Sequence, residues 1–289
     1  MDGNSLLRYR IFDPTGNITA LVESVVAEER QPSVAAALMH RHPEVEQVGY
    51  VRFEDGVGAD PAGKLRMAGG EFCGNASMCA AALLRQRREN AGLCSSAEET
   101  AVCLRVSGAA RPVALRLRRE TEESFRCAVC IPPARAIREL PFAFEGLRDV
   151  LAAVELEGIS HIILEPGSPL YALRTDREAA GRAVRAVCAA LEAAGAGLMF
   201  LDRNGTTPQL TPLVYIPGSG TEFWENSCAS GSAAVGMLLA ARSGGPVRLS
   251  LQEPGGSLHI SSEPNGETWL NGSVRLVSSW AIPIPQTQD

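Results

Sequence analysis

Two stretches of the sequence share one design: GGEFCGNASMCAAALL (69–84) and TEFWENSCASGSAAVGMLLA (221–240). Each places a glutamate and an aromatic residue shortly before a cysteine, and each continues with small residues and an apolar, helix-like run. The cysteines, Cys73 and Cys228, fall in opposite halves of a chain of 289 residues. The pattern predicts, in both halves, a helix that starts directly after a cysteine.

Short strand-like segments dominate the sequence around these two helices. Further helices are predicted over 33–42 and over 176–195, with Gly195 ending the second. Both halves therefore contain many strands and few helices, and the cysteine motifs also share a serine four positions on, Ser77 and Ser232. We expect an α+β fold of two pseudo-symmetric domains, 1–133 and 134–271, because prolines interrupt the pattern near 131–140.

The composition narrows the function classes. An apolar content of 45% suits a globular chain with a substantial core, and the formal net charge of −6 gives no electrostatic reason to bind nucleic acid. No apolar stretch approaches the roughly 20 residues that would span a bilayer. The N-terminus lacks the basic and apolar regions of a signal peptide. We expect a cytoplasmic protein that does not associate with membranes.

Most of the eight cysteines have structural explanations. Cys103 and Cys188 lie among apolar neighbours, as small core residues do. Cys127 and Cys130 form a C-x-x-C within an alternating, strand-like segment, and no second ligand pair follows at a zinc-binding spacing. We therefore expect free thiols in a reducing compartment and no metal site.

Cys73 and Cys228 differ from the other cysteines, because a helix N-terminus favours negative charge and lowers the pKa of a thiol. The small residues behind them, Gly74-Asn75 and Ala229-Ser230, leave backbone amides free to hold a carboxylate. Two such ends facing one cleft would place one thiol as base and the other as acid on opposite faces of a carbon. This chemistry is racemisation or epimerisation.

Two other function classes remain open at this stage. A Cys–His protease would need a histidine near a cysteine; His40 and His42 are expected in solvent, whereas His161 could line a cleft. A protease does not explain two cysteine motifs. A non-catalytic protein that uses the helix ends as a carboxylate clamp would need no thiols, so cysteine substitution separates it from a racemase.

The segments FCGNAS and ENSCASGSA resemble the paired active-site signatures of the diaminopimelate epimerase superfamily. The resemblance implies a cofactor-independent isomerase with one catalytic cysteine in each domain. Each domain would be a β-sheet curled around a central helix, with the active site in the interdomain cleft. The C-terminal strand, 272–289, would return to the first domain. Relatives of this kind suggest a homodimer.

The resemblance is closer to one branch, the histidine racemases of staphylopine-type metallophore synthesis. It rests on FDPTGNITALV, EQVGYV, GGEFCGNASM, GLMFLD, LVYIPGSGTEFWENSCASGSA and EPGGSLHISS, and it covers about residues 10–275. Diaminopimelate epimerases carry arginines near both motifs, whereas this chain has Met78 and the segment PGSGTEFWEN. The change to Phe223 and Trp224 suits an uncharged or aromatic substrate side chain.

The resemblance also assigns candidate site residues. Glu46 and Glu225 would stand beside the cysteines and hold the substrate ammonium group or relay a proton. Asn17 and Asn75 would bind the carboxylate or amine, and His161 would line the cleft from the second domain. The expected function is interconversion of L- and D-histidine to supply a metallophore pathway; the alternative within enzymes is diaminopimelate epimerase.

Overall fold

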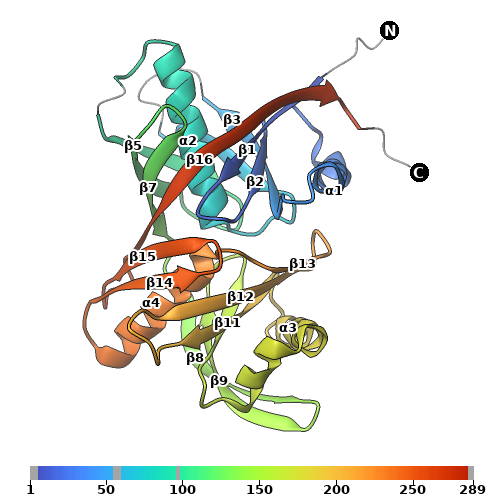
Figure 1. Cartoon of the computed structure of the whole chain (residues 1–289), viewed down its shortest axis with the longest axis vertical. Helices are drawn as coiled ribbons and strands as arrows, with labels where there is room; N and C mark the ends of the chain where they lie inside the picture. Colours follow the sequence, from blue (N-terminus) through green and yellow to red (C-terminus); the bar gives the residue numbers. More distant parts are fainter. Residues whose placement is uncertain (1–5, 55–59, 96–97, 286–289) are drawn as a thin grey trace.

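The computed structural model describes residues 6–54, 60–95 and 98–285, and it shows a mixed α/β protein that is rich in strands (Figure 1). Residues 286–289, the predicted end of the last strand, lie outside the described residues. No helix of the described part combines the length and apolarity needed to span a bilayer.

The described elements follow each other along the chain in two runs. The first run is β1 (Leu6–Asp13), β2 (Thr19–Val22), η1 (Glu28–Arg30), α1 (Gln31–Arg41), β3 (Gln47–Phe53), β4 (Gly63–Met67), α2 (Gly74–Asn90), β5 (Thr100–Val106), β6 (Val113–Arg119) and β7 (Ser124–Ile131). The second is β8 (Ala136–Phe144), β9 (Leu147–Glu155), β10 (Ser160–Leu164), η2 (Pro169–Thr175), α3 (Arg177–Ala190), β11 (Ala196–Asp202), β12 (Gln209–Ile216), β13 (Thr221–Trp224), α4 (Ala229–Ser243), β14 (Val247–Glu253), β15 (Gly256–Ser262) and β16 (Thr268–Pro283).

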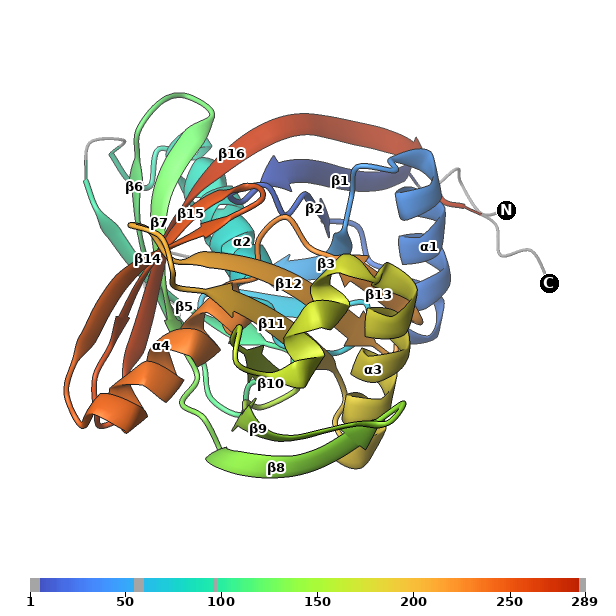
Figure 2. The same cartoon turned by 60° about the horizontal axis from the view of Figure 1, so that its bottom comes forward.

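The strands form one hydrogen-bonded path, in which β1 to β7 are neighbours in chain order and β15-β14-β12-β11-β10-β9-β8 continue beyond them. The long strand β16 joins the two series, because it pairs with β7, β15 and β1 (Figure 1). Helices α1 and α3 lie on the same side of the molecule, α1 near β3 and α3 against β11 and β12 (Figure 2).

Helices α2 and α4 are buried on every side over most of their length. All residues from Gly74 to Gln86 of α2 are buried, as are those from Ala229 to Leu238 of α4. A helix that is apolar all round belongs in a core, so the runs of alanine, leucine and methionine after the cysteines explain this placement. One hydrophobic cluster includes residues of both helices. The pseudo-symmetry of the two halves and the domain boundary stay predictions.

The predicted end of α3 is wrong. The helix ends at Ala190 and not at Gly195. Gly195 instead opens β11 closely against β12: a Cβ atom there would lie 2.6 Å from Cδ1 of Ile216. The glycine therefore serves close packing between strands, whereas Glu192, with φ of 50°, makes the left-handed turn after the helix.

Two glycine turns hold the first and second halves together by backbone contact. Gly16 follows β1 with φ of 93°, and Gly255 lies between β14 and β15. A Cβ atom on Gly255 would lie 2.6 Å from the carbonyl oxygen of Thr15 and 2.7 Å from Cα of Gly16. The amide of Gly255 donates to the carbonyl of Asn226, 2.7 Å away, just before Cys228. The crossing of these turns therefore fixes the segment that carries one cysteine.

We expect the substitution Gly255→Ala to lower the free energy of unfolding by about 1–3 kcal/mol, because the methyl group would overlap backbone atoms that cannot move independently. Urea unfolding measures the effect. The control is Gly245→Ala: nothing lies within 4 Å of a Cβ atom at that position, so its effect should stay within about 0.5 kcal/mol. Equal stability of the two variants would contradict the close contact between the turns.

Candidate active site

The N-termini of α2 and α4 meet inside the protein. Cys73 and Cys228 are the N-cap residues of the two helices and both have extended backbones. A Cβ atom on Gly74 would lie only 2.9 Å from Cβ of Ala229, so the first helical residues are in direct contact. Both cysteines line one small cavity. The structure therefore brings the two sequence motifs together.

Cys73 is held in a network of neutral polar groups. Its Sγ atom accepts a hydrogen bond from the amide of Ala76 (3.3 Å) and donates one to Oε1 of Gln47 (3.0 Å). The Gln47 amide group is oriented by its own bonds, because Nε2 donates to Oγ1 of Thr19 (2.9 Å) and to Oδ1 of Asn17. Gln47 therefore presents an acceptor to the protonated Cys73 thiol.

Cys228 lies among carboxyl groups. Its backbone amide donates to Oε2 of Glu253 (2.7 Å), and its sulfur lies 3.7 Å from Oγ of Ser230. Burial is the first cause of a raised pKa of this thiol, and the charges of Glu225 and Glu253 raise the pKa further. Burial raises the pKa of Glu225 to about 8, although its hydrogen bond with Cys228 acts in the other direction.

The prediction that the helix N-termini lower the thiol pKa values is wrong for the free enzyme. Burial raises the pKa of Cys73 to about 12, and the bond from the Ala76 amide offsets only part of this effect. A thiolate at this position therefore loses more hydration than the helix end replaces. Formation of a thiolate must therefore be coupled to substrate binding or to a high pH.

Asn17 and Asn75 connect the two halves at the floor of the cavity. Nδ2 of Asn75 donates to Oδ1 of Asn17 (3.1 Å) and to the carbonyl oxygen of Ser227 (3.1 Å). Oδ1 of Asn75 is buried and has no hydrogen-bond partner. A buried amide oxygen without a partner is costly, so this atom is available to an N–H donor of a ligand.

Glu46 takes a different place from the predicted one. It does not line the thiol cavity; its neighbour Gln47 does. The Glu46 carboxylate accepts hydrogen bonds from Nδ2 of Asn17 (2.6 Å) and from the side chain and backbone amide of Asn226. Burial raises its pKa, and these three bonds lower it in part. Glu46 thus bridges the two halves at the cavity mouth.

His161 also differs from the prediction. Its side chain is fully buried and lines neither the thiol cavity nor the pocket beside it. Nε2 lies 2.9 Å from Oγ of Ser230, and Nδ1 has no partner. Gly197 on the neighbouring strand makes room for the ring, since a Cβ atom there would lie 2.4 Å from Nδ1. Burial lowers the pKa of His161 to about 3, so the neutral ring supports Ser230 from behind.

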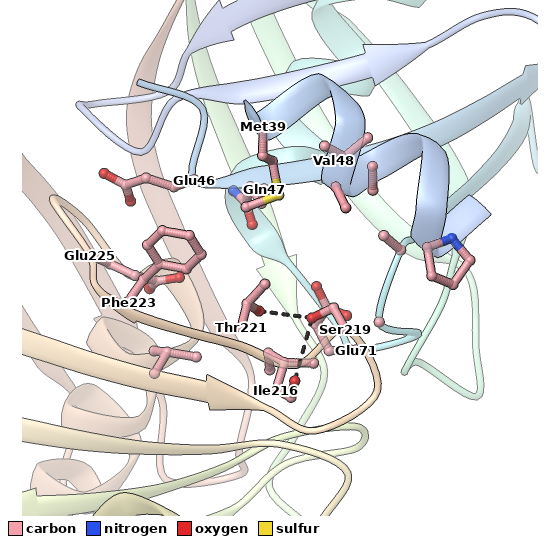
Figure 3. Close-up of a pocket in the computed structure, with 16 residues that line it drawn as sticks. Met39, Glu46, Gln47, Val48, Glu71, Ile216, Ser219, Thr221, Phe223 and Glu225 are labelled. Atoms are coloured by element: carbon pink, nitrogen blue, oxygen red, sulfur yellow. Dashed lines mark hydrogen bonds between the residues drawn. The ribbon is translucent and has the colours of Figure 1, made fainter. Parts of the chain in front are cut away.

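A larger pocket, drawn in Figure 3, adjoins the thiol cavity. Gln47, Glu71, Val214, Ile216 and Glu225 line both spaces. The pocket lies between α1 and β3 on one side and the β12–β13 hairpin on the other (Figure 3). Its lining residues include three glutamates and several apolar side chains, but no lysine or arginine.

Phe223 and Trp224 face opposite sides of β13, as neighbouring strand residues do. Phe223 lines the larger pocket (Figure 3). Trp224 turns away and stacks on Phe200 with ring centroids 5.6 Å apart, under the guanidinium group of Arg177. Only Phe223 is therefore placed to contact a ligand, and Trp224 belongs to the core of the second half.

Three residues of the site were not predicted from the sequence. Gln47 contacts Cys73, Glu71 lines both spaces, and Glu253 accepts from the Cys228 amide. Oε2 of Glu71 is buried without a hydrogen-bond partner, and burial raises the pKa of this carboxyl group. For Glu71 a signal existed, because it lies two positions before Cys73.

The fold is that of known racemases and epimerases. A predicted epimerase from Pseudomonas aeruginosa has a TM-score of 0.64 with 18% identity, and the match covers 96% of this chain and 99% of that one. A hydroxyproline epimerase from Agrobacterium vitis, solved with trans-4-hydroxy-L-proline, has a TM-score of 0.63 with 12% identity and covers 99% and 95%. These two matches show that the chain has the fold of racemases and epimerases.

Sequence comparison defines the family more closely. The family model described as the histidine racemase CntK N-terminal domain matches residues 7–280. A histidine racemase from Fusobacterium nucleatum is 26% identical over 98% of this chain and 100% of its own length. One from Staphylococcus aureus is 26% identical over 95% and 96%. The chain belongs to the histidine racemase family and is an isomerase.

Proposed function

We propose that the protein interconverts L- and D-histidine without a cofactor, with Cys73 and Cys228 as the two acid–base groups. The observation that carries the proposal is the meeting of two N-cap cysteines at one cavity. One thiolate removes the proton from Cα, and the opposite thiol delivers a proton to the other face. The product has the inverted configuration. The sulfur that began as a thiolate is now a thiol, and the opposite sulfur is now a thiolate.

The helix ends supply the site for the amino-acid backbone. The amides that follow Cys73 and Cys228 are available to the substrate carboxylate, since helix N-termini bind anions. The bound carboxylate also accepts the negative charge that develops when Cα loses its proton. The free Oδ1 atom of Asn75 and the carboxyl groups of Glu225 and Glu71 suit the ammonium group and other N–H donors.

The pocket beside the cavity favours histidine over diaminopimelate. The distal end of diaminopimelate carries a carboxylate, and a carboxylate needs a cationic or amide partner when it is buried. The lining residues of this pocket offer glutamates and no lysine or arginine. An imidazole ring, in contrast, can pack on Met39 and Phe223 and donate its N–H to a carboxylate such as Glu71.

The test is incubation of the purified protein with L-histidine in heavy water. We expect the circular dichroism of the solution to decay to zero and D-histidine to carry deuterium at Cα from its first appearance. Remaining L-histidine should carry much less deuterium at early times, because each face has its own acid. L,L-Diaminopimelate should be unchanged under the same conditions. Turnover of diaminopimelate but not of histidine would contradict the proposal.

The metabolic role is a further part of this proposal. D-Histidine is not used in protein synthesis, so a dedicated racemase implies an enzyme that consumes the D-amino acid. The resemblance to histidine racemases of metallophore pathways supports the view that this second enzyme uses D-histidine to make an opine-type metallophore.

A further inference from the structure

The two cysteines have unequal electrostatic surroundings, although they occupy equivalent positions. Cys73 donates to the neutral amide of Gln47, and the charges of Glu225 and Glu71 act on its thiol. Cys228 faces Glu225 at the cavity and has Glu253 behind it. Glu253 is the last residue of β14, and it is only 2% exposed. A fully buried carboxyl group so close to one of two matched thiols distinguishes that thiol from the other.

Glu253 is fixed to the start of α4 by both of its oxygens. Oε2 accepts the Cys228 amide at 2.7 Å, and Oε1 accepts the hydroxyl group of Ser232. Both donors belong to the helix that carries Cys228, so the carboxyl group cannot move away without breaking them. The N-terminus of α2 has the sulfur of Cys73 in a capping role, bonded to Ala76.

We propose that Glu253 keeps the proton on Cys228 as the pH rises, so that Cys73 is the first thiol to become a thiolate. The inference rests on the proposed two-thiol chemistry, in which one sulfur must be a base while the other remains an acid. If both thiols lost their protons, nothing could protonate the second face of Cα. Glu253 is thus a positioning residue that preserves the unequal pair without touching the substrate.

The other groups near Cys228 are consistent with this assignment. Glu225 repels a thiolate on either cysteine, and Glu71 also acts on Cys73, so Glu253 is the carboxyl group that acts on Cys228 and not on Cys73. His161, behind Ser230, is neutral and supplies no compensating positive charge. Burial raises the pKa of Glu253 to about 8, so its charge appears in the alkaline range, where loss of the second thiol proton would otherwise begin.

The substitution Glu253→Gln tests the charge while keeping the shape. The amide oxygen of glutamine can still accept the Cys228 amide, and its NH₂ group can donate to Ser232. Alkylation of the free enzyme with iodoacetamide, followed peptide by peptide by mass spectrometry between pH 6 and 11, reports each thiolate separately. We expect the Cys228 profile to match that of the unmodified protein below about pH 8 and to shift down by about one to two pH units above it.

The Cys73 profile should remain unchanged in the same experiment. The falling limb of the pH profile for kcat/KM should move down together with the Cys228 profile. The matched control is Ser232→Ala, which removes a hydrogen bond that lowers the pKa of Glu253 but keeps the carboxyl group; the Glu253 charge then appears at a higher pH, and the Cys228 profile should shift down by less than in Glu253→Gln. A constant Cys228 profile in Glu253→Gln, or equal shifts in the two variants, would overturn the proposal.

The unmodified protein provides a second measurement that does not depend on a variant that folds. The alkylation rate of Cys73 should begin to rise at a lower pH than that of Cys228. The opposite order would overturn the assignment. Alkylation needs no turnover, so the two proposals can fail separately. Failure to racemise histidine would refute the proposed function, whereas the alkylation profiles would still test the effect of Glu253 on Cys228.

Discussion

Replacing either Cys73 or Cys228 by serine is expected to reduce racemisation of histidine by at least about 1,000-fold, the range that general acid–base groups contribute. Both thiols line the cavity where the two helices begin, and each serves one face of Cα. A serine hydroxyl releases its proton far less readily than a thiol, so neither variant completes the exchange. Polarimetry or chiral chromatography measures the loss.

Binding of L-histidine should survive in the same variants, because the backbone amides of Gly74 and Ala229 do not depend on the sulfur atoms. Titration calorimetry should show a dissociation constant within about tenfold of that of the unmodified protein, or about 1.4 kcal/mol. The control, Cys103→Ser, changes a strand residue that does not line the cavity and should leave turnover unchanged. Near-normal racemisation by one of the two site variants would indicate a single-base enzyme.

The sequence predicted the two central helices well, because each combines an N-cap cysteine with a run that is apolar on every face. It did not predict the β8–β9 hairpin. Prolines before β8 indicated a boundary, and the alternating exposed residues of β8 left little hydrophobic signal; Pro141 lies within this strand. Proline is tolerated there because β8 is the edge of the sheet.

The site was predictable where the motif itself supplied the residues. Cys73, Asn75 and Cys228 lie in the quoted stretches, and the structure brings them to one cavity. Glu253 was not predictable, since it lies on a strand that follows α4 and reaches the Cys228 amide only through the fold. Gln47, the first residue of β3, stands next to a glutamate that the resemblance favoured, and only the fold shows that it is Gln47 that lines the thiol cavity.

The protonation states could not be inferred from sequence, because two effects oppose each other. A helix N-terminus stabilises a negative charge by about 0.3–1 kcal/mol, and by about 2 kcal/mol in favourable buried geometries. Full burial can shift a pKa by about 3–5 units, which corresponds to about 4–7 kcal/mol. The second effect is larger, which explains why the pKa of Cys73 is raised although its sulfur accepts a helix amide.

Treatment with hydrogen peroxide is expected to abolish nearly all activity by joining Cys73 to Cys228. Peroxide converts one sulfur to a sulfenic acid, and the other sulfur displaces water from it to form the disulfide. Both sulfurs line the same cavity, and the residues that follow them are in direct contact, so the sulfurs are well placed to react. Mass spectrometry of non-reduced peptides should find this link, and dithiothreitol should restore activity.

Two comparisons separate this crosslink from general oxidation. Saturating L-histidine should slow the inactivation, because the substrate occupies the space between the sulfurs. Cys103 and Cys130 lie on other strands, outside the cavity. Peroxide should therefore inactivate the variant Cys103→Ser, which keeps Cys130, at the same rate as the unmodified protein. Loss of activity with a disulfide between other cysteines, and without protection by histidine, would show that Cys73 and Cys228 do not flank one substrate carbon.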